Sequence, residues 1–211
     1  MKSKKQAIEI IKILKNYYPE AVCSLDFSTP FEMLISVMLS AQCTDERVNK
    51  TTPSLFLKYN TPETVAKADI KEIEKIIHPC GFYKNKAKNM IACSKMLLEK
   101  YNGIVPSNME DLQKLPGVGR KSANVIMLEA FHDPQGIAVD THAKRISNKI
   151  GFSDKQEPEK IEQDLLKVIP KEYYYDVNHL FVWHGRYTCN ARKPNCVECP
   201  VKNYCDEYNK K

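Results

Sequence analysis

The chain has 211 residues, of which 43% are hydrophobic and 27% are charged. This is an ordinary globular composition, sufficient for one large domain or two small ones, and it argues against intrinsic disorder and fibrous repeats. The 32 Lys and Arg residues against 26 Asp and Glu leave a net charge of +6. Such a mild basic excess is compatible with a polyanionic partner but does not prove one.

No apolar stretch is long enough to span a bilayer, since the best candidate, 31–39, includes Glu32 and Ser36. The basic residues at 1–6 are not followed by the apolar segment of a signal peptide. We therefore expect a cytoplasmic protein with no membrane partner. In that reducing compartment, eight cysteines do not indicate a disulfide framework.

Helix signals recur along the chain. Ser3 and Gln6 have the spacing of a capping box, and apolar residues at helical spacing follow as far as Tyr17. Helices are also expected at about 30–40, 70–77, 85–101, 107–114, 120–131, 141–150, 158–168 and 173–185, with Asp69 and Ser107 as two of the caps. The helix at 30–40 is apolar nearly all round and belongs at the centre of a core. The possible strands at 103–105 and 136–139 are too short to build a sheet, so the chain is predicted to be all-α, with a break near 132–136.

The residues 115–119, Leu-Pro-Gly-Val-Gly, connect the helix expected at 107–114 to the one that begins at Arg120. Pro116 ends the first helix because it has no N–H to donate. Gly117 and Gly119 permit positive φ and carry no Cβ, so backbone N–H groups at the start of the next helix face outward. Such a hairpin suits a phosphate, and a plain tight turn between packed helices is an equal alternative.

Two residues near this hairpin are candidates for chemistry. Lys121 lies in the first turn of the following helix, where the positive end of the helix dipole disfavours its ammonium form. A solvated surface lysine is the simpler interpretation, and the hairpin directly before it favours a functional one. Asp140 directly precedes the helix at 141–150, where a helix N-cap is its simplest role. The same carboxylate can also project into a cleft.

Four cysteines crowd the C-terminus with the spacing Cys189-x6-Cys196-x2-Cys199-x5-Cys205. Four thiols in so short a stretch can close around one metal centre. Zinc modules usually carry two Cys-x2-Cys pairs, whereas one is present here, and the spacing also differs from the ferredoxin patterns. The spacing therefore predicts a metal site and leaves zinc and iron–sulfur both open.

The segments 115–121, 139–142 and 184–189, taken with the cysteine spacing, resemble the endonuclease III family of helix–hairpin–helix DNA glycosylases and abasic-site lyases. The resemblance extends over almost the whole chain. It implies an all-α fold of two lobes with DNA bound between them. One is a six-helix barrel lobe at 22–132, with the helix–hairpin–helix at 107–131, and the other is a four-helix and iron–sulfur cluster lobe at 1–21 plus 133–211.

The resemblance also implies a cofactor and a mechanism. The four C-terminal cysteines would hold a [4Fe–4S] cluster. An oxidised pyrimidine would be flipped out of the DNA stack, because its sugar is inaccessible inside the duplex. Lys121 would attack the sugar C1′ and form a Schiff base, and β-elimination would cut the strand 3′ to the lesion. Asp140 would stabilise the cationic sugar and assist deprotonation.

DNA contacts are implied in the same way. Gln42 and Phe82 match the positions that fill the gap left by the flipped nucleotide. Phe82 stands where the family often has an aliphatic residue, which leaves the opposite-base preference open. Arg192 and Lys193, between the first two cysteines, form a cationic pair suited to phosphates. The further DNA contacts expected are Leu115, Gly117, Val118, Gly119, Arg120, His142 and Arg145.

The expected partner is damaged double-stranded DNA, bound by a monomer in a bacterial-type cytosol and associated with the nucleoid through DNA. Two alternatives remain. One is a mismatch or ultraviolet-dimer glycosylase of the same superfamily. The other is a non-catalytic DNA-binding cluster protein, against which the presence of both Lys121 and Asp140 argues.

Overall fold

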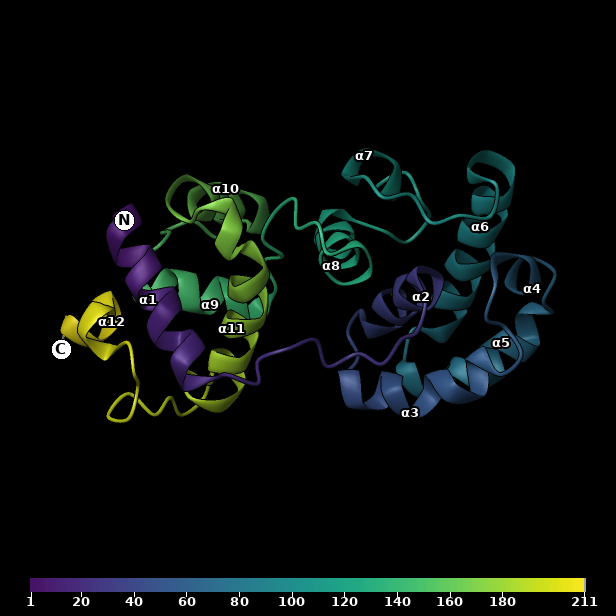
Figure 1. Ribbon diagram of the computed structural model, residues 1–211. Helices are drawn as coiled ribbons and strands as arrows, with labels where there is room; N and C mark the ends of the chain where they lie inside the picture. The colour runs from purple at the N-terminus through teal and green to yellow at the C-terminus, as the bar shows by residue number, and fades with distance from the viewer. Residues whose placement is uncertain (211) are drawn as a thin grey trace. The chain divides into compact units, whose positions relative to one another are not determined.

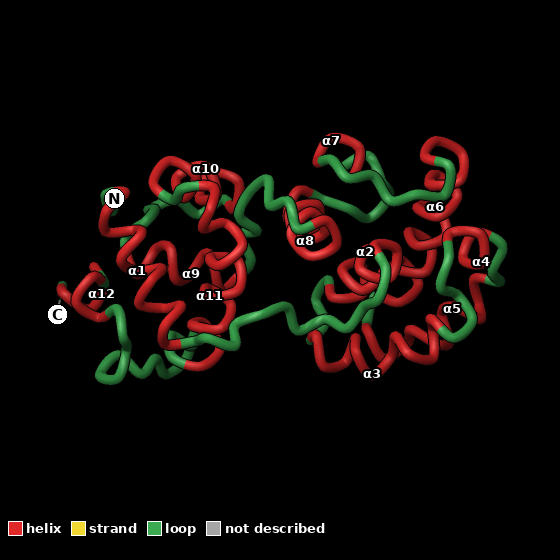
Figure 2. Tube along the Cα trace, in the orientation of Figure 1, coloured by secondary structure: helices red, strands yellow, loops and turns green. Residues whose placement is uncertain are grey.

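The computed structural model describes residues 1–210, and within that range it contains helices and no strand (Figure 2). The all-α prediction is confirmed. The chain divides into two compact units. One is Ser24–Asp133, and the other joins Met1–Cys23 to the chain from Pro134 onward.

The unit Ser24–Asp133 is built around one apolar helix. Its elements are α2 (Pro30–Ser40), α3 (Asp45–Phe56), α4 (Pro62–Ala66), α5 (Ile70–Ile77), the 3-10 turn η1 (His78–Cys80), α6 (Tyr83–Tyr101), α7 (Met109–Leu112) and α8 (Arg120–Phe131). Helix α2 packs against α3, α6 and α8 (Figure 1). Its residues from Phe31 to Leu39 are buried apart from Glu32, which is half-buried. The prediction that this helix lies at the centre of a core is therefore confirmed.

The other unit contains α1 (Lys4–Tyr17), α9 (Thr141–Ile150), α10 (Pro158–Val168), η2 (Lys171–Tyr173), α11 (Tyr174–Tyr187), η3 (Lys202–Tyr204) and α12 (Asp206–Asn209). The Ser3–Gln6 capping box is present at the start of α1. The buried face of α1, including Ile10 and Leu14, packs into a core with Ile146, Leu165 and Phe181. The first helix of the chain therefore belongs with its C-terminal part.

Several expected boundaries are wrong. The helix expected at 107–114 is the short α7, and its cap is Asn108 rather than Ser107 because the Asn108 Oδ1 accepts from the Asp111 N–H at 2.9 Å. The expected Asp69 cap of α5 is confirmed, because its carboxylate accepts from the Lys71 N–H at 2.9 Å. Helix α3 was not expected at all. This helix contains Pro53 in its interior, although proline favours the first turn of a helix.

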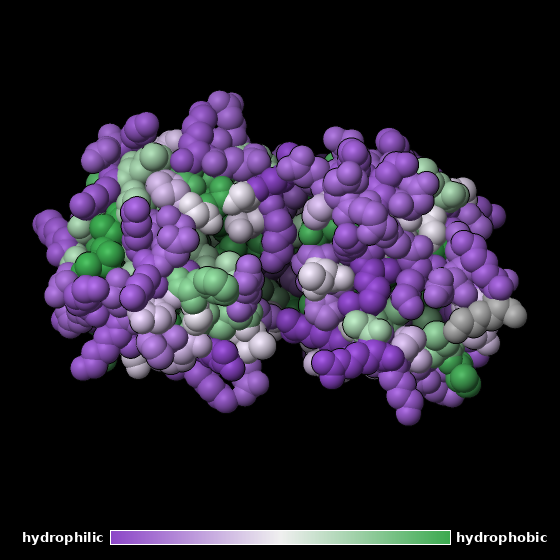
Figure 3. Space-filling view, turned by 180° about the vertical axis from the view of Figure 1, so that it is seen from behind, coloured by the Kyte–Doolittle hydropathy of each residue, from purple (hydrophilic) through white to green (hydrophobic). Residues whose placement is uncertain are grey.

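Hydrophilic side chains cover most of the face of the molecule drawn in Figure 3, with smaller hydrophobic patches among them. Across residues 1–210, no helix combines the length and the apolar character needed to cross a membrane.

Candidate functional site

The turn between α7 and α8 requires glycine at position 117 for two reasons. Gly117 has φ +82°, a conformation that side chains disfavour. A Cβ at this position would also lie 2.9 Å from Met38 Cε and 3.1 Å from Asn89 Cβ, closer than packed carbon atoms approach. The Val118 N–H donates to Leu115 O at 3.1 Å and closes the turn. The glycine thus lets the hairpin lie directly against α2 and α6.

The start of α8 is open to an anion. Gly119 is its N-cap, with an extended backbone and no side-chain cap, and a Cβ there would meet nothing within 4 Å. The first N–H groups of a helix lack intrahelical partners and favour negative charge. Leu115 and Val118, both expected to contact DNA, are 2% and 6% exposed, so neither presents its side chain to a ligand. Arg120 and Gly119 are exposed.

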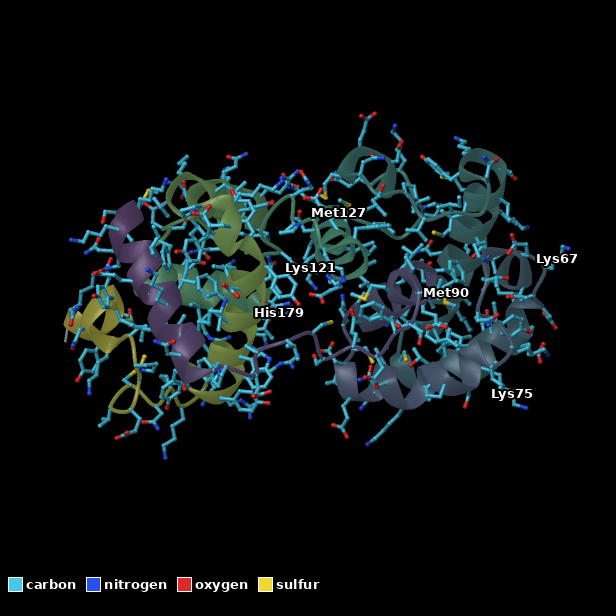
Figure 4. The ribbon with its side chains drawn as sticks, viewed as in Figure 1. Lys67, Lys75, Met90, Lys121, Met127 and His179 are labelled. Carbon is cyan, nitrogen blue, oxygen red and sulfur yellow. The ribbon has the colours of Figure 1, made fainter. Side chains whose placement is uncertain are left out.

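The two lysines that flank the hairpin differ in their surroundings. Lys114 Nζ lies 2.8 Å from Glu110 Oε1 and 3.0 Å from Asp111 Oδ1, and these two carboxylates raise the pKa of Lys114. Lys121 lies in the first turn of α8 and is exposed (Figure 4). Its amine forms no ion pair with any residue in 1–210. Of the two amines, that of Lys121 is the one left free for a ligand.

Asp140 is the N-cap of α9, as its position before that helix predicts. Its Oδ1 accepts from the Ala143 N–H at 2.7 Å, and its side chain is half-buried. Burial lowers the pKa of the neighbouring His142, and the Asp140 carboxylate acts in the opposite direction. Because a single oxygen forms the cap, the second carboxylate oxygen is available for another role.

Arg145 makes contacts that its expected role in DNA binding did not suggest. Its Nε donates to Cys189 O at 3.0 Å and its Nη2 donates to Gly185 O at 2.9 Å. A Cβ on Gly185 would lie 2.7 Å from His142 Nδ1, so α9 and α11 pack closely here. Arg145 thereby connects α9 to the end of α11 and to the first cysteine of the C-terminal group.

The two expected gap-filling residues share an uncommon backbone. Gln42 has φ +53° and Phe82 has φ +46°, and Gly81, directly before Phe82, has φ +66°. Left-handed conformations at residues with side chains cost energy and cluster at ligand sites. Phe82 is 67% exposed despite its aromatic ring, and Gln42 is exposed too.

A pocket connects these loops to the hairpin. It is lined by Met38, Ala41, Gln42, Phe82, Asn85, Lys86, Asn89 and Gly117. Three residues expected to contact DNA, Gln42, Phe82 and Gly117, therefore surround one hollow of the unit Ser24–Asp133. The sequence interpretation missed Lys86 and Asn89, although both lie at helical spacing after the Gly81–Phe82 turn.

The four C-terminal cysteines line one pocket of their own unit, together with His184, Lys149 and Thr188. All four are free thiols and half-buried. Within residues 1–210, no three side chains of the metal-binding types converge as the ligands of a single ion would. The four sulfur donors line one shared hollow, and thiolates are the ligands that iron–sulfur clusters use.

Hydrogen bonds shape the segment that carries these cysteines. Asn195 N–H donates to Thr188 O at 2.9 Å, and the Lys193 N–H donates to Asn190 Oδ1 at 2.7 Å. The Cys205 thiol donates to Lys149 O at 3.2 Å. The loop between the first two cysteines is thereby closed at its base, and it presents Arg192 and Lys193 as exposed cations.

His184 is one of the residues that line the cysteine pocket. Its Nε2 is 3.7 Å from Cys199 Sγ, and its Nδ1 is 3.1 Å from the Tyr18 hydroxyl. Burial lowers the pKa of His184 to about 4 and raises the pKa of the Cys199 thiol to about 11. A metal centre binds cysteine as thiolate, so its assembly here would release protons.

Comparisons with known proteins agree with this geometry. The chain matches the model of the HhH-GPD superfamily of base excision DNA repair proteins over residues 35–171. An endonuclease III from Synechocystis sp. is 48% identical over 206 residues, covering 97% of this chain and 94% of the relative. A solved non-covalent endonuclease III–DNA complex has a TM-score of 0.94 at 44% identity, covering 100% of this chain and 98% of that one. A trapped endonuclease III–DNA covalent intermediate has the same TM-score and identity, covering 100% and 99%.

The matched range includes the hairpin, Lys121 and Asp140, and the full-length similarity extends through the four cysteines. The resemblance on which the sequence interpretation rested is therefore confirmed. The chain belongs to the HhH-GPD superfamily of base excision DNA repair proteins and, within it, is a DNA glycosylase and abasic-site lyase of the endonuclease III type.

Proposed function

We propose that Lys121 is the nucleophile and Asp140 the electrostatic partner in the removal of oxidised pyrimidines from duplex DNA. The observation that carries the proposal is the exposed, unpaired amine of Lys121 directly behind a glycine hairpin with open N–H groups. An anion bound at the hairpin would bring a DNA phosphate close to this amine. The trapped covalent intermediate of a relative supports a covalent mechanism.

The chemistry proceeds through a Schiff base. The neutral amine of Lys121 attacks C1′ of a flipped nucleotide, and the C1′–N bond breaks with its electron pair leaving on the base. The nitrogen of Lys121 then loses a proton, the C1′–O4′ bond breaks and O4′ takes up a proton, so the opened sugar remains bound to Lys121 as a Schiff base. Loss of a proton from C2′ then expels the 3′ phosphate and cuts the strand. Asp140 stabilises the positive charge that develops on the sugar and assists deprotonation.

Gln42 and Phe82 fill the space that the flipped nucleotide vacates. Unstacking a base costs energy, and side chains that enter the stack offset part of that cost. The left-handed backbone at both residues and the exposed ring of Phe82 support this role. The exposed Arg120 and the backbone of the hairpin bind phosphates. His142 and Arg145 are proposed as further DNA contacts.

An incision assay tests the proposed function. Duplex DNA with one oxidised pyrimidine should lose the base and be cut 3′ to the lesion, and a duplex with an abasic site should be cut as well. A mismatch or ultraviolet-dimer enzyme would prefer its own lesion in the same panel. A protein that shifts abasic DNA in a gel without cutting it would be a binder, and the proposal would be wrong.

We propose further that Cys189, Cys196, Cys199 and Cys205 hold a [4Fe–4S] cluster. The four thiols around one pocket and the family membership support this assignment. The cluster would cross-link the C-terminal segment to the unit that contains α1 and α9–α11, and thereby fix the loop with Arg192 and Lys193. No step of the base-removal chemistry depends on it.

The cluster is open to direct analysis. The purified protein should be yellow-brown and should contain iron and acid-labile sulfide. Cys199→Ser should remove the colour and lower the thermal stability, because ligand binding and folding are coupled. Cys93→Ser is the matched control and should keep the colour, since Cys93 is a fully buried cysteine of the other unit. Zinc without iron in anaerobically prepared protein would overturn the assignment.

The loop cations should contribute to affinity rather than to chemistry. Arg192→Ala with Lys193→Ala should weaken DNA binding and flatten its salt dependence by about one unit of slope per lost phosphate contact. Single-turnover base removal at saturating enzyme should be unchanged. Lys4→Ala with Lys5→Ala removes the same charge from the exposed face of α1 and should leave the slope as it was. Equal slopes for both double variants would exclude the loop as a phosphate contact.

We place this activity in the bacterial cytosol, at the nucleoid, because an endonuclease III of similar length occurs in a bacterium. We also propose that a monomer suffices, since one chain supplies the hairpin, Lys121, Asp140 and all four cysteines. Sedimentation of the protein on a short lesion duplex measures this stoichiometry directly.

A further inference from the structure

Lys86 on α6 is a buried lysine without a part in the chemistry above. Its side chain is only 6% exposed. Its Nζ donates to Leu39 O at 2.7 Å and to Cys80 O at 2.8 Å, and it forms no ion pair with any residue in 1–210. Burying a cation is costly unless it is well hydrogen-bonded, and burial lowers the pKa of Lys86. A methionine would fill this site without that cost, so the amine calls for an explanation.

The two acceptor carbonyls lie just before the two gap-filling residues. Leu39, near the end of α2, is three residues before Gln42, and Cys80, the last residue of η1, is two residues before Phe82. One ammonium group thus joins two loops that come from different elements of the unit. Both loops then enter the left-handed region, at Gln42 and at Phe82. Conformations of this kind persist only where the surroundings enforce them.

The same lysine lines the pocket that these residues surround. Gln42, Phe82 and the hairpin residue Gly117 share that pocket with Lys86. The amine therefore lies where the two loops and the hairpin meet. The Cys43 N–H to Ser40 O bond at 3.0 Å and the Gly81 N–H to His78 O bond at 3.3 Å stabilise each loop singly. Each of these two backbone bonds lies within one loop, whereas the two hydrogen bonds of Lys86 join one loop to the other.

We propose that Lys86 is a positioning residue for base flipping, which sets the spacing between Gln42 and Phe82 so that both enter the base stack together. The inference rests on the proposed gap-filling role of those two residues. It adds a third group, which does not touch DNA and acts through the two backbone carbonyls. Its contribution should appear where a base must be unstacked, and should be small where the base is already absent, because unstacking then costs least.

Lys86→Met tests this inference by removing the amine from a side chain of similar length. Single-turnover removal of a paired oxidised pyrimidine should slow about 10-fold to 100-fold, the scale of a small misplacement of positioning groups. Incision of a preformed abasic site in the same duplex should change by less than about 3-fold. Rates are expressed per active molecule, counted by borohydride trapping on abasic DNA, so that a misfolded fraction cancels.

Two further measurements separate positioning from general stability. A 2-aminopurine placed beside the lesion should brighten on binding of the wild type and brighten less with Lys86→Met. In the background of Gln42→Ala with Phe82→Ala, Lys86→Met should add little further loss of base removal, because residues that act through one another are not additive. Lys95→Met, at an exposed site of the same helix, is the control for the lost charge.

The outcomes distinguish this inference from the proposed function. Equal slowing on both substrates, full activity of Lys86→Met on the paired lesion, or additive losses in the triple variant would each overturn the positioning role. Wild-type protein that cuts neither substrate would instead overturn the proposed function. Lys86→Arg restores a cation with several donors. Partial recovery of base removal in this variant would support the positioning role of Lys86.

Discussion

Lys121→Ala should abolish the covalent adduct that borohydride traps between the wild-type protein and abasic or lesion DNA. The reason is that the trapped species is the reduced Schiff base, and Lys121 is the amine proposed to form it. Base removal under single-turnover conditions should fall on the order of 10³-fold or more, as when other covalent nucleophiles are removed. Lys121 is exposed, so the melting temperature should hardly change.

Lys114→Ala is the matched control on the other side of the hairpin. Glu110 and Asp111 raise the pKa of Lys114, which keeps its amine protonated and a poor nucleophile. This variant should give the adduct in wild-type yield. An undiminished adduct with Lys121→Ala, or its loss with Lys114→Ala, would move the nucleophile away from Lys121.

Local sequence patterns were sufficient for much of the fold. The boundaries of α8, α9 and α10 agree with the expected helices 120–131, 141–150 and 158–168. Each has a local signal that starts it: Gly119 after the hairpin, Asp140 as a cap, and Pro158 at the first helical position. Such signals act over a few residues, which is why they can be read without knowing the tertiary structure.

Features that depend on distant contacts were not predictable in the same way. The motif pattern marks Leu115 and Val118 as possible DNA contacts, yet both side chains are buried. Nothing in the spacing of Arg145 indicates that it donates to carbonyls about 40 residues away. The bond between Lys86 and Leu39 likewise spans 47 residues. Periodicity reports which face of a helix is apolar, and it does not report what that face meets.

The candidate site likewise combines features that local sequence predicts with features that depend on distant contacts. The glycine at 117 and its positive φ follow from the sequence of the hairpin, whereas its contacts with Met38 and Asn89 follow only from packing. No glycine lies beside Gln42, so the sequence does not indicate its left-handed backbone. Phe82 follows Gly81, and that glycine does indicate a turn. The cysteine spacing predicted a metal site, whereas only the fold shows that all four thiols line one pocket.

Asp140→Asn should separate the two roles of this residue. Asparagine caps a helix about as well as aspartate, so its Oδ1 can still accept from the Ala143 N–H. The substitution removes the negative charge that would stabilise the developing cation on the sugar. Abasic DNA should bind about as tightly as before, and single-turnover base removal should fall roughly 100-fold, the scale of one preorganised electrostatic partner. Only kinetics and binding measured on the same preparation can establish this difference.

Glu157→Gln provides the control for charge alone. Glu157 is the exposed N-cap residue of α10 in the same unit, so this variant also removes a negative charge from a helix start. A carboxylate at a helix N-terminus is stabilising, so both variants should lose a little thermal stability. Base removal should stay at the wild-type rate with Glu157→Gln. If Asp140→Asn loses activity only in proportion to its lost thermal stability, Asp140 is a helix cap alone and its catalytic assignment is wrong.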